Sequence, residues 1–422
     1  MKICGMVFLL FIRGILSAFD TSAPIAIVID ADQGKVLFEK NARMPCFPAS
    51  TTKIATALYT LYQKGEDLDD MVFASKDALQ TVPTTVRRNQ GPSYRLEPGG
   101  THIGLQVGEV LSLRTLLHGL MLASGNDAAN VLAEYVSGSV ERFMEELNLF
   151  LYHIGCEDTH FTNPHGLPDH QHQTTAFDLA KMAQIAMRIP VFRKIVSTTQ
   201  YEREATHRQP SSMFVQTNAL LRASTKHFYP DATGVKTGYT SQAGYNIVAS
   251  ASRNGRNLIA VVCQCEESAK RFRAVQQLLD MLLDEPKQTR KLFSREHELY
   301  HHELSGAKTA LDSILQEDVL VSFYPSEKKS FTSQMSWREL TLPIYPGMPV
   351  GSLQILDEQL NLVTEVMLLA KNLVEPTWSY RIEMQTKQIV NACMAYRKEL
   401  GYLLALGCLM VPCWKRVRRQ YG

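Results

Sequence analysis

The sequence predicts an α+β fold, with an antiparallel sheet covered by helices, followed by a small all-β domain. Strand-like apolar runs occur near both ends of the first 285 residues, at 23–29 and 258–263, and helical periodicity fills much of the interval between them. This order favours an antiparallel sheet with helices packed on its faces. Beyond residue 318 the apolar runs are short and separated by Pro and Gly, a pattern typical of an all-β domain.

The elements of the first domain follow from the periodicity of its apolar residues. A hairpin is expected where the run 23–29 meets a second strand at 35–38 across a turn containing Asp30, Asp32 and Gly34. The segment 71–108 is polar and rich in Gly, Pro and Arg, which indicates an irregular excursion. The remaining elements are helices over 50–62, 113–122, 126–135 and 175–187, strands over 245–251 and 258–263, and a final amphipathic helix over 269–283.

The second half of the chain divides into shorter parts. Residues 287–303 are charged and indicate a linker, and the strands expected after it lie at 319–323, 340–344, 351–355 and 363–368. The domains predicted from these boundaries are a main domain over 19–285, a small β-rich domain over 286–385 and a juxtamembrane segment over 386–399.

Both termini carry signals for export and membrane attachment. Lys2, a short apolar run and Leu16-Ser17-Ala18 predict a signal peptide over 1–18, with a buried first helix as the alternative. Residues 400–414 are apolar and precede a basic tail over 415–422, which favours a spanning anchor over a helix lying in the interface. We therefore expect a protein of the cell inner membrane whose main domain lies on the periplasmic side.

Composition excludes some classes of function. Lys plus Arg number 44 and Asp plus Glu 42, so the formal net charge of +2 argues against a nucleic-acid partner. The cysteines outside the terminal segments, which show no repeated spacing and leave any disulfide unassigned, are Cys46, Cys156, Cys263, Cys265 and Cys393. Cys263 and Cys265 flank one residue of a predicted strand, so we expect both side chains on one face, where they pack.

Three short motifs occur in a fixed order: Ser50-Thr51-Thr52-Lys53, Ser124-Gly125-Asn126 and Lys236-Thr237-Gly238. The S-x-x-K pattern recurs at Ser305 and Ser326, so it carries little weight alone. Only Ser50 opens an apolar-periodic helix, whereas the other two lie in polar stretches. Ser50 is therefore the candidate nucleophile.

The first motif makes chemical sense at the start of a helix. Residues three apart share a helix face, so Lys53 can act as the base that Ser50 needs. The pKa of this lysine must fall for that role, and the helix N-terminus and a second cation, Lys236, would both lower it. The backbone N–H of Ser50 can supply half of an oxyanion hole.

Together the motifs resemble the penicillin-binding protein and serine β-lactamase superfamily. Their surroundings are similar to those of low-molecular-mass serine D-alanyl-D-alanine carboxypeptidases, which implies a β-lactamase/transpeptidase-like main domain and no cofactor or metal. The stretches that carry the resemblance are Pro48 to Lys53, Met121 to Ala129, Asn163 to Leu167, Gly234 to Tyr245 and, more loosely, Tyr345 to Leu353.

The resemblance implies a role for each motif residue. Ser50 would be acylated by the stem peptide of peptidoglycan or by a β-lactam, Lys53 would accept its proton, and Ser124 would help to protonate the departing D-alanine. The residues that would bind substrate are Asn126, Lys236, Thr237, Gly238, Tyr239 through its N–H, and Arg271, which would bind the carboxylate. Tyr239 stands where a histidine often follows K-T-G, which concerns fine specificity.

Three other functions are open at this point. A class A β-lactamase would need a deacylating glutamate, and Glu145-Glu146-Leu147-Asn148 resembles its motif with a spacing one residue short. A non-catalytic wall-binding scaffold would retain the fold, although the intact motifs argue against it. A metallopeptidase is disfavoured because no H-E-x-x-H occurs, and its ligands would come from His160, His165, His170 and His172.

Overall fold

The computed structural model describes residues 21–65, 68–89, 91–327, 329–392 and 394. Their contacts divide them into two compact units. The N-terminal unit comprises 21–286 together with 324–327, and the C-terminal unit comprises 287–323 and the described residues beyond 328. Each unit has a hydrophobic core of its own.

The N-terminal unit is built on a five-stranded antiparallel sheet with the strand order β2-β1-β9-β8-β7. Strands from the two ends of the unit pair centrally, with Ile27 of β1 opposite Val261 of β9. The sheet confirms the α+β prediction and the antiparallel arrangement. Its strands are β1 (Ile25–Asp30), β2 (Val36–Lys40), β7 (Ala232–Thr240), β8 (Gly244–Arg253) and β9 (Arg256–Cys265).

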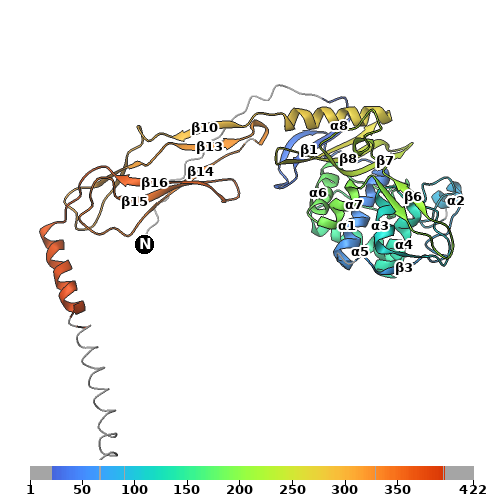
Figure 1. Cartoon of the computed structure of the whole chain (residues 1–422), viewed down its shortest axis with the longest axis horizontal. Helices are drawn as coiled ribbons and strands as arrows, with labels where there is room; N and C mark the ends of the chain where they lie inside the picture. The colour runs from blue at the N-terminus through green and yellow to red at the C-terminus, as the bar shows by residue number, and fades with distance from the viewer. Residues whose placement is uncertain (1–20, 66–67, 90, 328, 393, 395–422) are drawn as a thin grey trace, which may run out of the picture. The chain divides into compact units, whose positions relative to one another are not determined.

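Helices cover both faces of this sheet (Figure 1). Alternate residues of β1 explain the two layers, because Ile25, Ile27 and Ile29 join one core cluster while Ala26 and Val28 join the other. One face is covered by α8 (Ser268–Leu283), with Leu220 and Tyr229 joining the same core cluster. The other carries α1 (Lys53–Lys64), α3 (Leu113–Met121), α4 (Asn126–Ser137), α5 (Val140–His153), α6 (Ala176–Met187) and α7 (Pro190–Ser197).

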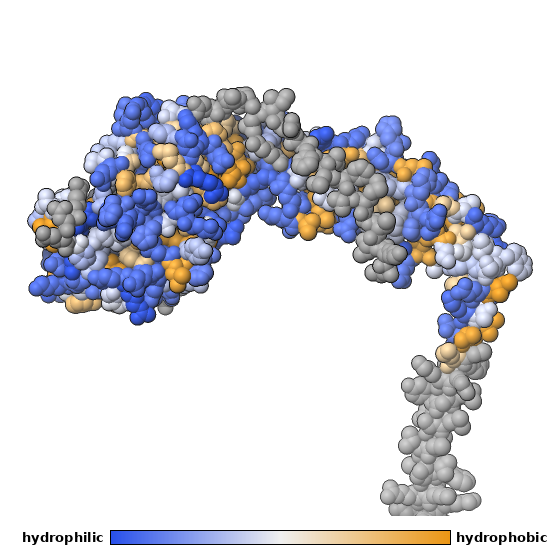
Figure 2. All heavy atoms as spheres, turned by 180° about the vertical axis from the view of Figure 1, so that it is seen from behind, coloured by the Kyte–Doolittle hydropathy of each residue, from blue (hydrophilic) through white to orange (hydrophobic). Residues whose placement is uncertain are grey.

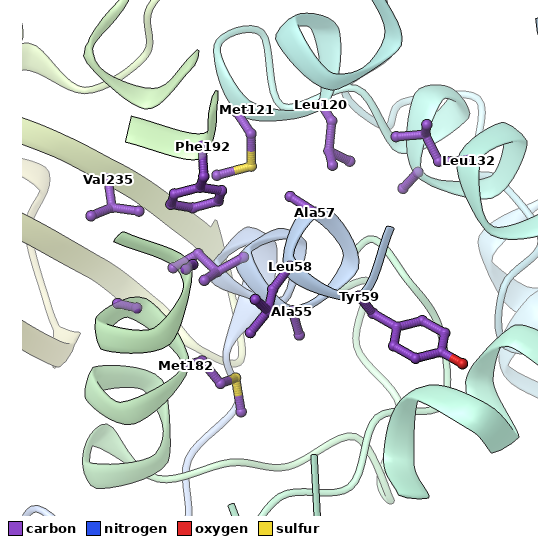
Figure 3. Close-up of a cluster of buried hydrophobic side chains, with 14 of the residues drawn as sticks. Ala55, Ala57, Leu58, Tyr59, Leu120, Met121, Leu132, Met182, Phe192 and Val235 are labelled. Carbon is purple, nitrogen blue, oxygen red and sulfur yellow. The ribbon is translucent and has the colours of Figure 1, made fainter. Parts of the chain in front are cut away.

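The helix α1 lies at the centre of the helical layer. Figure 3 shows its residues Ala55, Ala57 and Leu58 surrounded by side chains from other helices and from β7. Because α1 is buried along most of its length, its first turn is held in a fixed position against the sheet.

The excursion at 71–108 contains short regular elements that the sequence pattern does not reveal. They are β3 (Met71–Phe73), which pairs with β4 (Val110–Ser112), and α2 (Thr84–Asn89). A second hairpin, β5 (Gln200–Arg203) with β6 (Ser212–Val215), lies between α7 and β7.

The prediction that Cys263 and Cys265 share one face is wrong. Cys263 joins the core beneath the helical layer, whereas Cys265 joins the core beneath α8. Gln264 between them has φ +61°, and the pairing register of β8 with β9 shifts beside it, so strict alternation is lost. Cys46, Cys156, Cys263 and Cys265 are free and buried, and Cys393 lies outside the described residues.

The C-terminal unit is rich in strands, as expected. Its larger sheet has the order β11-β12-β16-β15-β14, and β10 pairs with β13 in a separate ladder. The strands are β10 (Gln288–Phe293), β11 (Tyr300–His302), β12 (Leu311–Leu315), β13 (Val319–Phe323), β14 (Thr332–Trp337), β15 (Pro349–Leu356) and β16 (Leu362–Ala370).

Two predictions for this unit are wrong. Residues 287–303 are not a linker, because they contain β10 and β11, and the charged residues Arg290 and Lys291 of β10 are exposed although the strand pairs with β13. Residues 340–344 are not a strand, and only Ile344 forms an isolated bridge, to Val374. Pro343 has no backbone N–H and cannot donate to a ladder, which explains the interruption.

A helix over 378–392 follows β16 and extends into the predicted juxtamembrane segment. Its exposed surface mixes hydrophobic and hydrophilic side chains, with Trp378, Ile382 and Ile389 all exposed (Figure 2). Among the described residues, no helix is both long and apolar enough to cross a bilayer. The predicted signal peptide (1–18) and anchor (400–414) lie outside the described residues.

Candidate active site

Ser50 lies in a short 3₁₀ turn, Ala49–Thr52, that leads directly into α1. The helix therefore begins at Lys53 and not at Ser50 as predicted. Ala49 has φ +50°, a conformation that costs a non-glycine residue about 1 kcal/mol or more. The side chain of Asn246 on β8 holds this turn, because its Nδ2 donates to the carbonyl oxygens of Phe47 (2.8 Å) and Pro48 (3.1 Å).

Lys53 is fully buried and its Nζ has three oxygen neighbours. Nζ lies 3.0 Å from Ser50 Oγ, 2.7 Å from Asn126 Oδ1 and 2.7 Å from the carbonyl oxygen of His165. The last two atoms are acceptors only. A neutral amine that donates its two N–H groups to them directs its lone pair at the Ser50 hydroxyl.

The second motif joins this cluster at the start of α4. Ser124 is buried, has φ +63° and precedes Asn126, the first residue of the helix. The neighbouring Asp127 carboxylate accepts from the backbone N–H groups of Ile103, Gly104 and Leu105. The excursion at 71–108 is thereby held against α4, next to Asn126.

The third motif lies on β7, which passes directly beside the Ser50 turn. A Cβ built on Gly238 would be 3.0 Å from Ser50 N and 2.9 Å from Pro48 O. Glycine permits this close approach of strand and turn. The ring of the next residue, Tyr239, is half-exposed and stacks on Tyr245 at 4.1 Å between centroids.

Two buried lysines dominate the electrostatics of the site. Burial, followed by the positive charge of Lys236, holds the pKa of Lys53 well below its usual value. Burial, followed by the charge of Arg271, lowers the pKa of Lys236 to about 7. Since a lowered pKa increases the neutral fraction, Lys53 is suited to accept a proton at neutral pH.

Arg271 contacts the back of the third motif. It is buried on α8, and its Nη1 donates to the carbonyl oxygens of Gly238 (3.0 Å) and Asn246 (3.1 Å). Burial lowers the pKa of its guanidinium to about 10. In this structure Arg271 supports the backbone of β7 and β8, and its binding of a substrate carboxylate stays a prediction.

The structure adds residues to the site that the motif analysis quoted only as part of a block or did not mention. Gly166 has φ +92°, and a Cβ there would lie 1.9 Å from the carbonyl oxygen of Ala49. His165 supplies the carbonyl that binds Lys53, and Asn246 secures the Ser50 turn. Gly166 belongs to the Asn163 to Leu167 block that resembles the family. Nothing in the sequence around Asn246, by contrast, predicts its contact with the Ser50 turn.

The four histidines considered as metal ligands make separate contacts. His165 Nε2 lies 3.0 Å from the carbonyl oxygen of Tyr94, and His172 Nε2 lies 2.9 Å from Thr52 Oγ1. His160 contacts the carbonyl of Gln171, and His170 lies beside Asp169. In the described part of the chain, no group of histidine, cysteine and carboxylate side chains could hold a metal ion.

Glu145, the first residue of the shortened motif, is exposed on α5, and the contacts of its neighbour Glu146 lie away from Ser50. The Glu146 carboxylate accepts from Ser137 (2.6 Å), Arg142 (2.8 Å) and Tyr59 (3.3 Å). Tyr59 follows Lys53 by six residues on α1, which is about 9 Å along the helix axis. This distance disfavours the class A β-lactamase alternative.

Solved structures with the same fold are known. The D-alanyl-D-alanine carboxypeptidase DacD from Francisella tularensis matches with a TM-score of 0.58 at 23% identity, covering 87% of this chain and 97% of the other, which supports the fold alone. Penicillin binding protein 5 from Haemophilus influenzae matches at 25% identity with a TM-score of 0.57, covering 85% and 99% of the two chains. The Streptomyces K15 DD-transpeptidase gives 28% identity and a TM-score of 0.55 over 63% of this chain and 98% of its own.

Similar sequences carry the same family description. The D-alanyl-D-alanine carboxypeptidase DacF of Bacillus subtilis is 34% identical over 274 residues, covering 65% of each chain. DacC of Escherichia coli is 34% identical over 260 residues, covering 60% of this chain and 59% of its own. The match thus spans somewhat less than two thirds of these relatives. The family model for D-alanyl-D-alanine carboxypeptidases of peptidase family S11 matches residues 15–267, more than half of the sequence, and the chain therefore belongs to this family.

Proposed function

We propose that this chain is a serine-type D-Ala-D-Ala carboxypeptidase that removes the terminal D-alanine from the pentapeptide stems of peptidoglycan. The observation that carries the proposal is the environment of Lys53. Its buried amine has two acceptors fixed at 2.7 Å and faces Ser50 Oγ at 3.0 Å. This arrangement provides Ser50 with the adjacent base that a serine nucleophile requires.

The proposed acylation step follows from this geometry. Ser50 Oγ attacks the carbonyl carbon of the D-Ala–D-Ala bond while its proton passes to Lys53. The C–N bond then breaks, and the departing amine takes a proton from Lys53 through the Ser124 hydroxyl. The products are free D-alanine and an ester on Ser50, which water hydrolyses to regenerate the hydroxyl.

The remaining site residues position the substrate in this proposal. The N–H groups of Ser50 and Tyr239 stabilise the oxyanion, and Asn126 binds a backbone amide of the stem peptide. Lys236, Thr237 and Arg271 provide the positive and hydrogen-bonding groups for the terminal carboxylate. β-Lactams would acylate the same serine, because their strained amide resembles the D-Ala–D-Ala bond.

Mass spectrometry tests the proposal directly. Incubation with a β-lactam should add one acyl group to the peptide that contains Ser50, and incubation with a D-Ala-D-Ala pentapeptide should release free D-alanine. Ser50→Ala should abolish both. An adduct on another residue would contradict the assignment of Ser50, and a stable adduct without release of D-alanine would favour a non-catalytic scaffold.

We also propose that the protein acts outside the cytoplasm, held at the membrane by residues 400–414. A truncation before Leu400 should release a soluble enzyme with unchanged acylation, because every proposed site residue precedes residue 272. A tag placed after Gly422 should survive protease added to the outer face if the segment spans the membrane. Loss of the tag would instead support a helix that lies in the interface.

A further inference from the structure

A cavity lies in the N-terminal unit outside the candidate active site, and none of the motif residues lines it. Its volume is about 610 Å³, which is within the range of small-molecule sites. It is bounded by the ends of α6 and α7, by the turn between β1 and β2, and by β7, β8 and β9. The lining side chains that bear on its chemistry are Asp32, Arg188, Arg193, Lys194, Thr233 and Ser250.

The charges around this cavity are mostly positive. Arg188, Arg193 and Lys194 contribute three positive charges, and Asp32 contributes one negative charge. Each arginine donates from one nitrogen to a backbone carbonyl. Arg188 Nη2 lies 3.1 Å from Asp32 O, and Arg193 Nη1 lies 2.8 Å from Met187 O. Their other N–H groups, and the ammonium of Lys194, make no hydrogen bond or ion pair with the residues described here. The site therefore favours an anion.

Two hydroxyls add a donor to the wall. Ser250 is buried, and its Oγ lies 2.8 Å from Thr233 Oγ1. A pair of hydroxyls uses only one of its two protons in the mutual bond. The second proton can be donated to a ligand oxygen in the cavity.

The rest of the wall is apolar. Ala31, Met187, Leu258 and Ile259 line the cavity, which is large enough for a phosphate with an attached organic group. Guanidinium groups and an ammonium beside hydroxyl donors match the several oxygens of a phosphate. We propose that this cavity binds a phosphate ester, with the phosphate against Arg193, Lys194 and the hydroxyl pair and the organic group against the apolar wall.

The position of the cavity relates it to the third motif. The outer face of α7 lines the cavity, and its inner face packs on β7, where a Cβ on Gly234 would lie 2.9 Å from Val196 Cγ2. Figure 3 shows Phe192 of the same helix beside Val235, the residue before Lys236. A ligand in the cavity would thus contact the helix that supports the K-T-G strand.

Calorimetric titration of the full-length protein in detergent tests this proposal, with sn-glycerol 3-phosphate as the probe at low ionic strength. We expect saturable binding at one site and no binding of glycerol. Lys194→Glu should weaken the affinity about tenfold or more, because it removes one charge-assisted hydrogen bond and adds repulsion. Lys226→Glu, an exposed lysine of the same unit outside the cavity, is the matched control and should leave the affinity unchanged.

Two further measurements make the result decisive. β-Lactam labelling of Lys194→Glu at the wild-type rate would show that the variant is folded, and Lys194→Gln provides a neutral replacement. Titration with inorganic phosphate separates the two sources of the anion. If inorganic phosphate binds as tightly as sn-glycerol 3-phosphate, the site is one for free phosphate. If it binds more weakly, the organic group contributes and the ligand is an ester. Equal affinity of wild type and Lys194→Glu, or no binding tighter than about 10 mM, would overturn the proposal.

Discussion

The two units of this protein differ most in what they bury. The core of the N-terminal unit contains Lys53, Lys236, Asn126, Asp127 and His165, each no more than 4% exposed. Among the described residues of the C-terminal unit, the buried polar side chains are only Ser313 and Ser333, and the rest of the core is apolar. Both units bury strands in a similar way, so the contrast does not come from secondary structure.

This difference locates the candidate chemistry in the N-terminal unit. Burying a charged or polar side chain costs free energy unless it is paired. Such side chains are therefore expected mainly at functional sites, where the chemistry requires them. Burial is the larger cause of both lysine shifts, and it is followed by the charge of Lys236 for the pKa of Lys53 and by the charge of Arg271 for the pKa of Lys236. The C-terminal unit has no comparable cluster in its described part, and its core has the composition expected of a support.

The substitution expected to have the largest effect on activity is Lys53→Arg. The guanidinium stays protonated at any working pH, so the acylation rate at Ser50 should fall by about 10²- to 10⁴-fold, the usual contribution of a general base. The rate of β-lactam labelling measures the effect. Lys64→Arg, at the other end of α1, is the matched control and should acylate normally. An unchanged rate in Lys53→Arg would show that another group is the base.

Gly166→Ala should have the second largest effect. The new Cβ would lie 1.9 Å from the carbonyl oxygen of Ala49, so the Ser50 turn must move. Displacement of a reacting group by about 1 Å can reduce the rate by about 100-fold, and we expect a loss of about 10- to 100-fold in labelling. Gly138→Ala controls for backbone strain, because Gly138 also has a positive φ (+83°) but nothing within 4 Å of its Cβ. Equal losses in both variants would assign the effect to strain alone.

The pH dependence of β-lactam acylation should show two limbs. The rate should fall at low pH, because Lys53 becomes protonated and can no longer act as a base. Since the pKa of Lys53 is lowered, this fall should begin only below neutral pH. The rate should also fall above about pH 7, where Lys236 of the free enzyme loses the charge that binds a carboxylate. Past either limb the rate should change about tenfold per pH unit.

Lys236→Arg distinguishes the origin of the alkaline limb. Its guanidinium stays charged, so that limb should move to higher pH while the acid limb stays in place. An alkaline limb that does not move would assign it to a group other than Lys236.

The smallest effect on activity is expected from Leu368→Ala in the C-terminal unit. Leu368 is fully buried, so the unfolding free energy of that unit should fall by about 2–5 kcal/mol. Calorimetry of the full chain would detect the loss, and the rate of Ser50 acylation should not change. Leu120→Ala is the matched variant in the N-terminal unit, where it packs near α1 (Figure 3) and should reduce both stability and acylation. Slow acylation in Leu368→Ala would show that the units are energetically coupled.

The sequence by itself determined the fold class, the order of the motifs and most of the helices. The periodicity of apolar residues predicts α1, α3, α4, α6 and α8 because each buries apolar side chains in one of the two core clusters of the N-terminal unit. The strands β1, β8 and β9 are apolar runs for the same reason. The motif residues could be chosen because a serine, a lysine three residues later and a second lysine are a recognisable chemical set.

The tertiary structure alone decided features that depend on contacts between distant residues. The strand β7 carries K-T-G but has two glycines and few apolar residues, so its periodicity is weak, and its pairing with β8 defines it. The burial that lowers the pKa of Lys53 arises from three segments meeting at one atom. The separation of Cys263 from Cys265 arises from a bulge at Gln264. Local patterns report on neighbours in the chain, whereas close approach, bulges and desolvation are set by residues that the fold brings together from far apart.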